Sequence, residues 1–345
     1  MTGESKVLWA DSGSTHGDLV AAAFAVNGDA RRALTLASTL AAVPRPGEGR
    51  TAQLFDTLST LAAADLTAAR VAEAHLDALA ILHQAGYPAR PDQTWGVFAA
   101  ESSGPALTAT RAGDRWRLDG IKPWCSLAGS LSHALVTARV SGPAGDLGRR
   151  LFAVDLRDRG IRVHDDAWVA RGLCQVTSGP VDFSAVAADP VGDEGWYLRR
   201  PGFAWGGIGV AAVWWGGAVG MARTLYDSTE GPAPDQIALA HLGAVDVAVT
   251  GSKLALAAAA RAVDSGEADG PAGSLLAARV RGLVARTVDE VVFHIGHALG
   301  PAPLALDARH AQRVADLQLY VRQHHAERDD AALGRMLVTR GSAPW

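Results

Sequence analysis

Regular alternation of polar and apolar residues restricts the possible fold most, and it is confined to the middle of this 345-residue chain. It runs over residues 107–111 and 114–118, which Ala112 and Gly113 separate. Such alternation predicts two half-buried antiparallel strands joined by a tight turn. Further strand-like runs follow at 132–138, 150–156, 160–163 and 178–183. Several short strands at close spacing indicate a small β-barrel or sandwich.

Helical patterns occupy the chain on both sides of these strands. Residues 53–63 and 66–84 carry apolar side chains at three- and four-residue spacing, which is the period of a helix with one buried face. Beyond the strands, long helical patterns span 203–222, 233–265, 272–299 and 308–337. These make four, the number that an antiparallel bundle needs.

The predicted fold class is therefore α+β and mostly α. We expect an N-terminal helical domain over 1–92, a middle β-barrel or sandwich domain over 93–196 and a C-terminal four-helix bundle over 197–345. Such a chain is long enough to bury a large core.

Composition excludes several classes of partner. The net charge is −4 and charges of both signs are interspersed, so we expect no nucleic-acid partner. Cys125 and Cys174 match no metal-ligand spacing, so we predict no metal site. The first ten residues contain no apolar signal segment, and two thiols suit a reducing compartment, so we expect a cytoplasmic protein.

Residues 203–222 carry no charge and are nearly long enough to span a bilayer. The segment is isolated and rich in glycine, and arginines flank it, so we predict a buried bundle helix and no membrane association. Gly216 and Gly220, four residues apart, permit close helix contact. Residues 207–212 also match the Gly-x-Gly-x-x-Ala fingerprint, but no strand precedes them, so we regard this match as accidental.

Two motifs flank the alternating segment. Ala-Ala-Glu-Ser-Ser-Gly occupies residues 99–104, and Lys-Pro-Trp-Cys-Ser occupies residues 122–126. Their order resembles the middle domain of acyl-CoA dehydrogenases, and a looser similarity extends over residues 40–340. The resemblance implies the acyl-CoA dehydrogenase fold, with FAD as the cofactor that performs the redox chemistry.

The resemblance also implies a flavin site. Trp124 would pack against the isoalloxazine, and the Ser126 hydroxyl would hydrogen-bond near flavin N5. Ala99, Glu101 and Ser103 would lie along the other arm of the site. The alternative is structural: a buried Trp124 and a turn Ser126 would then stabilise a β-turn.

Desaturation of an acyl thioester requires a base for the α proton. The family uses a Glu on the last or the first bundle helix, and the aligned positions here hold His324 and Val210. We therefore expect a relocated group. It is either His324, an acid/base suited to neutral pH, or Glu327, three residues on and on the same helical face. The alternative is an exposed, charged helix end.

The family's Arg that reaches the flavin pyrophosphate is missing from residues 226–234. The adenosine half of FAD is therefore either bound weakly, bound by other residues, or not bound. We favour an FAD-dependent oxidoreductase acting on an acyl thioester or a similar small molecule with a non-standard base, its electron acceptor unidentified. Two alternatives are a flavin-dependent monooxygenase and a flavin-poor, non-catalytic subunit of a heteromer. The resemblance further implies a homodimer or homotetramer formed through the bundle.

Overall fold

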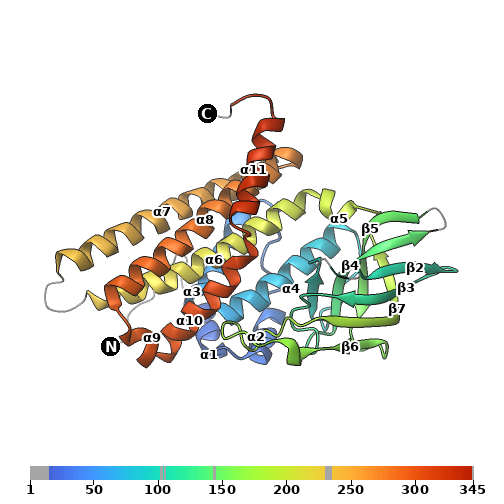
Figure 1. Cartoon of the computed structure of the whole chain (residues 1–345), viewed down its shortest axis with the longest axis horizontal. Coiled ribbons are helices and arrows are strands. Elements are labelled where there is room, and N and C mark those ends of the chain that lie inside the picture. The colour runs from blue at the N-terminus through green and yellow to red at the C-terminus, as the bar shows by residue number, and fades with distance from the viewer. Residues whose placement is uncertain (1–14, 102–103, 105, 143–144, 230–234, 344–345) are drawn as a thin grey trace.

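The computed structural model of the chain describes residues 15–101, 104, 106–142, 145–229 and 235–343. Helices, then a sheet, then helices again follow one another along the chain (Figure 1). The predicted fold class is confirmed. Ser103 lies outside the described residues.

The N-terminal helices are α1 (Thr15–Val26), α2 (Ala30–Ser38), α3 (Thr51–Ala64) and α4 (Leu66–Gln84). Asp65, between α3 and α4, fixes their arrangement. Its carboxylate caps α4 by accepting a hydrogen bond of 2.8 Å from the Ala68 N–H, and it also accepts one of 2.8 Å from the Gly28 N–H. One side chain therefore holds the α1–α2 turn against the start of α4.

The strands are β1 (Trp95–Phe98), β2 (Thr108–Ala112), β3 (Arg115–Lys122), β4 (His133–Gly142), β5 (Gly145–Asp155), β6 (Ile161–Val163) and β7 (Val181–Val191). Their order is β1-β4-β2-β3-β7-β5, and β5 also pairs with β4, so five strands close into a barrel. β1 and β6 pair outside this ring, with β4 and β7 respectively. Every predicted strand overlaps an observed one, although the run at 178–183 covers only the start of β7.

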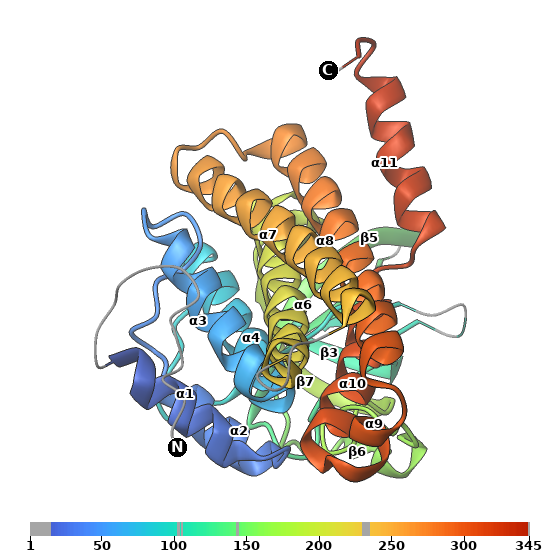
Figure 2. The same cartoon turned by 90° about the vertical axis from the view of Figure 1, so that its left-hand side faces the viewer.

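The C-terminal helices are α5 (Trp196–Arg199), α6 (Pro201–Ser228), α7 (Gln236–Asp264), α8 (Gly270–Leu299), α9 (Ala302–Leu306), α10 (Ala308–Tyr320) and α11 (Glu327–Thr339). The central helix is α6, which packs against α3, α7 and α8 (Figure 2). A β-carbon on Gly216 would lie 2.3 Å from the Ser59 carbonyl oxygen, and one on Gly220 would lie 2.7 Å from the Ala63 carbonyl oxygen. The glycines thus allow α6 to touch the backbone of α3, as their spacing predicts.

Both α6 and α7 are long and apolar enough to cross a membrane by length and composition. Most of the apolar segment of α6 is buried inside the protein, as expected for a core helix. The outer face of α7, in contrast, leaves Ile237, Val247 and Leu254 exposed.

The prediction of one continuous helix over 308–337 is wrong. α10 ends at Tyr320, a 3₁₀ turn covers Val321–Gln323, and α11 begins at Glu327. Ala326 interrupts the helix because its φ of 47° and ψ of −117° lie outside the helical region. As a result, α10 packs against α6 and α4, whereas α11 contacts α8 and projects from the body of the molecule (Figure 1).

Candidate functional site

The loop after β3 presents an aromatic ring at the surface. Trp124 has a φ of 58°, a left-handed backbone conformation that bulky residues rarely adopt, and its side chain is 59% exposed. Its ring is nearly perpendicular to the Trp168 ring, with 6.4 Å between the two centroids. The structural alternative required a buried Trp124, and that part of it is wrong. More than half of the Trp124 side chain is instead accessible to a ligand.

Two residues along the same loop, the Ser126 hydroxyl begins a chain of hydrogen bonds. Ser178 donates to the Val176 carbonyl oxygen at 3.0 Å, so the 2.9 Å contact between Ser126 and Ser178 has Ser126 as its donor. Arg70 Nη2 donates to the Ser126 Oγ at 3.1 Å. A guanidinium on α4 is thereby fixed directly beside the β-loop.

The same guanidinium binds a buried carboxylate. Arg70 Nη1 lies 3.0 Å from Glu73 Oε2, and the Tyr320 hydroxyl donates to the same oxygen at 2.9 Å. Arg70 also lies over the Tyr320 ring, 5.4 Å from its centroid. The Glu73 side chain is only 10% exposed, and burial raises its pKa although Arg70 and Tyr320 oppose the shift. Glu73 is therefore a carboxylate suited to accept a proton. Arg70 connects it to Ser126, through one hydrogen bond to each residue.

Glu101 is engaged in an ion pair. Its Oε1 accepts a hydrogen bond of 3.0 Å from the buried Lys122 Nζ, which also donates to the Thr137 hydroxyl at 2.8 Å. Arg149 adds a second ion pair at 3.6 Å. These contacts tie the end of β1 to β3 and β4. Ala99, just before Glu101, packs against the small core around Trp95.

His324 and Glu327 do not share a helical face, because the helix is broken between them. The buried His324 faces α8 and α11: a β-carbon on Gly282 would lie 3.8 Å from its Nε2, and Asp329 lies 3.8 Å from the same atom. Burial lowers the pKa of His324, with Asp329 opposing the shift. Glu327 is exposed at the start of α11. The expectation that these two residues share one helical face is therefore wrong.

Sequence reasoning missed the residues that the structure gathers beside Ser126. Arg70, Glu73 and Asp77 lie three and four residues apart on a helix that is otherwise mostly apolar. This spacing puts three charges on one face of α4. Charges at that spacing usually mark a solvent-exposed face, but most of α4 is buried. Their occurrence on a helix with so few other polar residues was the available signal.

A cavity of about 40 Å³ lies between α4, α6 and the loop that joins α2 to α3. Glu73 and Asp77 both line it. Glu73 thus lines the cavity and also binds Arg70, the residue that donates to Ser126.

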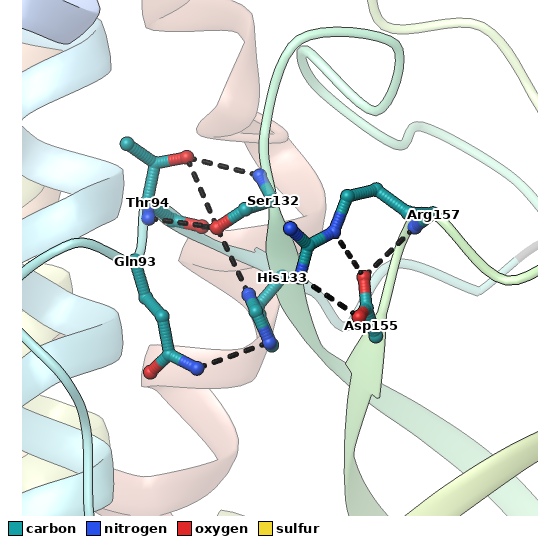
Figure 3. Close-up of polar contacts among 6 residues, drawn as sticks. All are labelled: Gln93, Thr94, Ser132, His133, Asp155 and Arg157. Atoms are coloured by element: carbon teal, nitrogen blue, oxygen red, sulfur yellow. Dashed lines mark hydrogen bonds and ion pairs between the residues drawn. The ribbon is translucent and has the colours of Figure 1, made fainter.

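A second polar cluster lies where β1 and β4 begin (Figure 3). His133 Nδ1 lies 2.9 Å from Ser132 Oγ, as in a serine nucleophile and its base. The Ser132 hydroxyl, however, donates to the Thr94 carbonyl oxygen at 3.1 Å and accepts from the Thr94 N–H at 2.9 Å. Asp155, the nearby carboxylate, is held by Arg157 at 2.8 Å. The cluster therefore fastens two strands together and lacks the geometry of a triad.

A helical N-terminal region, a closed barrel and a C-terminal set of long helices, in this order along the chain, make up the acyl-CoA dehydrogenase fold. The chain is similar in structure to dibenzothiophene monooxygenase TdsC from Paenibacillus sp. A11-2 in its FMN-bound form, with 16% identity, a TM-score of 0.79, and 95% and 97% of the two chains covered. Methanesulfinate monooxygenase MsuC from Pseudomonas fluorescens gives 18% identity, a TM-score of 0.78, and 96% of each chain covered. The steroid ACAD Tcur3481-Tcur3483 gives 19% identity, a TM-score of 0.74, and coverage of 96% and 99%. By sequence, the chain matches no protein-family model and no curated protein.

Proposed function

We propose that this chain is a flavin-dependent oxidoreductase in which Glu73 replaces the family's Glu, which is missing from the aligned positions His324 and Val210. The observation that carries this proposal is the continuous set of hydrogen bonds from Ser126 through Arg70 to Glu73. It brings a buried proton acceptor to the loop whose sequence resembles a flavin site. The fold and its monooxygenase and ACAD neighbours support the oxidoreductase class.

The groups at the loop fit an isoalloxazine. The exposed face of Trp124 can stack on a planar ring, and the Ser126 hydroxyl and the Arg70 guanidinium can bind its polar edge. When bound, a flavin accepts hydride or electrons from a substrate, or activates oxygen. Arg70 would stabilise negative charge on the reduced ring, while Glu73 would accept the substrate proton and Tyr320 would keep its carboxylate oriented.

FMN fits these residues at least as well as FAD. The sequence from Tyr226 to Gln236 contains no Arg or Lys that could hold a pyrophosphate. TdsC, which has the same fold, binds FMN. We therefore propose FMN as the first cofactor to test. FAD, the cofactor predicted from the sequence, is the one to compare it with.

Absorption spectroscopy tests the cofactor. Purified protein mixed with FMN or FAD and then desalted should retain a yellow chromophore. Trp124→Ala should weaken retention about tenfold, whereas Trp124→Phe, which keeps an aromatic face, should largely preserve it. A colourless protein that neither flavin reconstitutes would contradict the proposal and favour the flavin-poor subunit.

Anaerobic titration separates the two enzymatic possibilities. A dehydrogenase of this fold is bleached by its substrate without oxygen, and acyl thioesters are the first substrates to test. Two of the three similar structures named above are monooxygenases, and this favours oxygenation as the second candidate. A monooxygenase would need externally reduced flavin together with oxygen, and its substrate alone would cause no bleaching.

We also propose that the chain forms a homodimer or homotetramer through the outer face of α7. The apolar side chains exposed there, Ile237, Leu239, Val247 and Leu254, support this proposal. Association would remove them from water, and a homologous partner chain could cover the same face in a heteromer.

A further inference from the structure

A large groove lies between the start of α6, the start of α8 and the projecting helix α11. Its volume is about 990 Å³, at the upper end of the range of about 300–1,000 Å³ that is usual for small-molecule sites. None of the described residues that line it also lines the cavity beside Glu73 or belongs to the Trp124 loop. The groove is therefore separate from the candidate functional site.

The lining of the groove is largely apolar. Leu198 of α5, Phe203 of α6 and Met336 of α11 all line it, and they are 43%, 43% and 40% exposed. Leu275 and several alanines and prolines of the same helices complete the apolar part. Large apolar side chains that meet at one exposed concave surface mark a binding site, whereas scattered ones do not. An alkyl chain in the groove would remove these side chains from water.

Every charged residue in the described lining of the groove is an arginine, although the net charge of the chain is −4. Arg199 and Arg200 come from the end of α5 and the start of α6, and Arg335 and Arg340 come from α11. A cleft lined by charges of one sign concentrates ligands of the opposite sign. The groove therefore favours an anion.

The arginines near α5 are held by the protein. Arg200 Nη1 donates to Gln84 Oε1 at 2.8 Å, and an ion pair with Asp77 offsets its charge. Arg199 Nη2 donates to the Glu194 carbonyl oxygen at 2.8 Å. This carbonyl orients the guanidinium and supplies no counter-charge, so Arg199 adds positive potential to the groove.

The two arginines of α11 are available to a ligand. Among the described residues, no carboxylate forms an ion pair with Arg335 or Arg340. Met336 precedes Arg340 by four residues, so an apolar side chain and a cation lie side by side on α11. A guanidinium binds a carboxylate through two parallel N–H donors. The groove thus offers cationic groups for one end of a ligand and apolar surface for the rest.

We propose that this groove binds a fatty acid. Its carboxylate is held by the unpaired arginines of α11, Arg335 and Arg340. Its alkyl chain covers the apolar side chains of Leu198, Phe203 and Met336. A cationic amphiphile would meet uncompensated positive charge, and a short carboxylate would leave the apolar lining in water. Selective binding therefore requires both the negative charge and the chain.

Ligand-observed NMR on the full chain tests this proposal with octanoate, 1-octanol and octylamine as anionic, neutral and cationic probes of one chain length. We expect octanoate to bind at least about tenfold more tightly than 1-octanol, and octylamine to bind weakest. Butyrate, a short anion, should bind at least about tenfold more weakly than octanoate, because each buried methylene adds affinity.

Two sets of variants separate the charge from the apolar surface. Arg335→Gln combined with Arg340→Gln should lower the affinity for octanoate about tenfold and leave 1-octanol binding unchanged. Arg328→Gln, the same change at an exposed arginine of α11 outside the lining, should preserve the preference for octanoate. Ala272→Trp fills the groove from an exposed position on α8, so it should weaken octanoate and 1-octanol binding alike.

Equal affinity for octanoate and octylamine, an unchanged affinity for octanoate in the double variant, or no octanoate binding by the wild type would overturn the inference. No described residue of α11 is buried, so the arginine variants should unfold at the temperature of the wild type. Thermal unfolding checks this and distinguishes loss of the site from loss of the fold. Flavin retention is measured separately, because the groove shares no lining residue with the Trp124 loop.

Discussion

The carboxylate at position 73 is the residue on which the proposed chemistry depends most. Replacing Glu73 with Gln removes the proton acceptor and leaves the buried Arg70 without a counter-charge. Loss of a general base costs about 10²–10⁴-fold in rate. Breaking a buried ion pair by removing one partner costs about 3–5 kcal/mol of stability.

We therefore expect Glu73→Gln to lower the turnover of flavin reduction and the free energy of unfolding together. Steady-state kinetics and urea denaturation measure the two effects. Glu48→Gln is the matched control, because the Glu48–Arg45 pair is more than a third exposed and should contribute no more than about 1 kcal/mol. Unchanged turnover in Glu73→Gln would show that another group accepts the proton.

A second prediction at the residue scale concerns Asp316, which lies buried between α10 and the loop before β7. Burial raises the pKa of its carboxyl group from 3.8 to about 6, although hydrogen bonds from the Leu173 N–H and the Gln312 amide oppose the shift. A carboxyl whose folded pKa is raised destabilises the fold while it is ionised. This penalty is fully present above about pH 6 and is relieved as the pH falls towards 3.8.

The shift of about two units corresponds to about 3 kcal/mol. The free energy of unfolding of the wild type, relative to that of Asp316→Asn, should therefore increase by about 2–3 kcal/mol between pH 7 and pH 4. Denaturant titrations of both proteins across this range provide the measurement. Parallel profiles would mean that Asp316 titrates with an ordinary pKa.

At the scale of elements, close contact between α6 and α3 depends on glycine. A methyl group at Gly216 would meet the Ser59 carbonyl oxygen at 2.3 Å, and backbone cannot yield as a flexible side chain can. Gly216→Ala should destabilise the protein by about 1–3 kcal/mol or more. Gly243→Ala on α7, where nothing lies within 4 Å, should instead stabilise it by about 0.5–1 kcal/mol. Urea midpoints that move in the same direction in both variants would contradict this account.

The elements that the sequence predicts well are those with a local period. Alternation predicts β2 and β3, and three- and four-residue spacing predicts α3 and α4, because each pattern reflects one buried face. The break after α10 has no such signal, since residues 321–326 contain neither Gly nor Pro. At the break His324 lies beside Gly282 of α8, and Ala326 has a positive φ, a tertiary arrangement that no local pattern encodes. Helical spacing predicts that His324 and Glu327 share one face, and the same break separates them.

The site was predictable only where chain order determines it. The resemblance of residues 122–126 locates the loop that carries Trp124 and Ser126. Arg70 and Tyr320 come from helices 250 residues apart along the chain, and both meet at Glu73. Contacts of this kind depend on tertiary packing, which no local period reveals.

At the scale of the whole molecule, the exposed apolar face of α7 predicts association. Leu254 is 66% exposed in the isolated chain. We expect Leu254→Glu to shift the protein towards the monomer in sedimentation velocity, because it would place a charge in an apolar interface. Leu306→Glu, at an even more exposed position on the short helix α9, should leave the assembly unchanged. A wild-type protein that sediments as a monomer would rule out this interface.

One further consequence follows from Asp264, whose carboxylate anchors the loop over the cavity. It belongs to α7, the same helix whose exposed apolar side chains are open to a partner chain. If association displaces or steadies this helix, the roof of the cavity moves or stiffens with it. Ligand binding and association are then thermodynamically linked. A ligand that favours one position of this loop must favour, by the same free energy, the assembly state in which the loop takes that position.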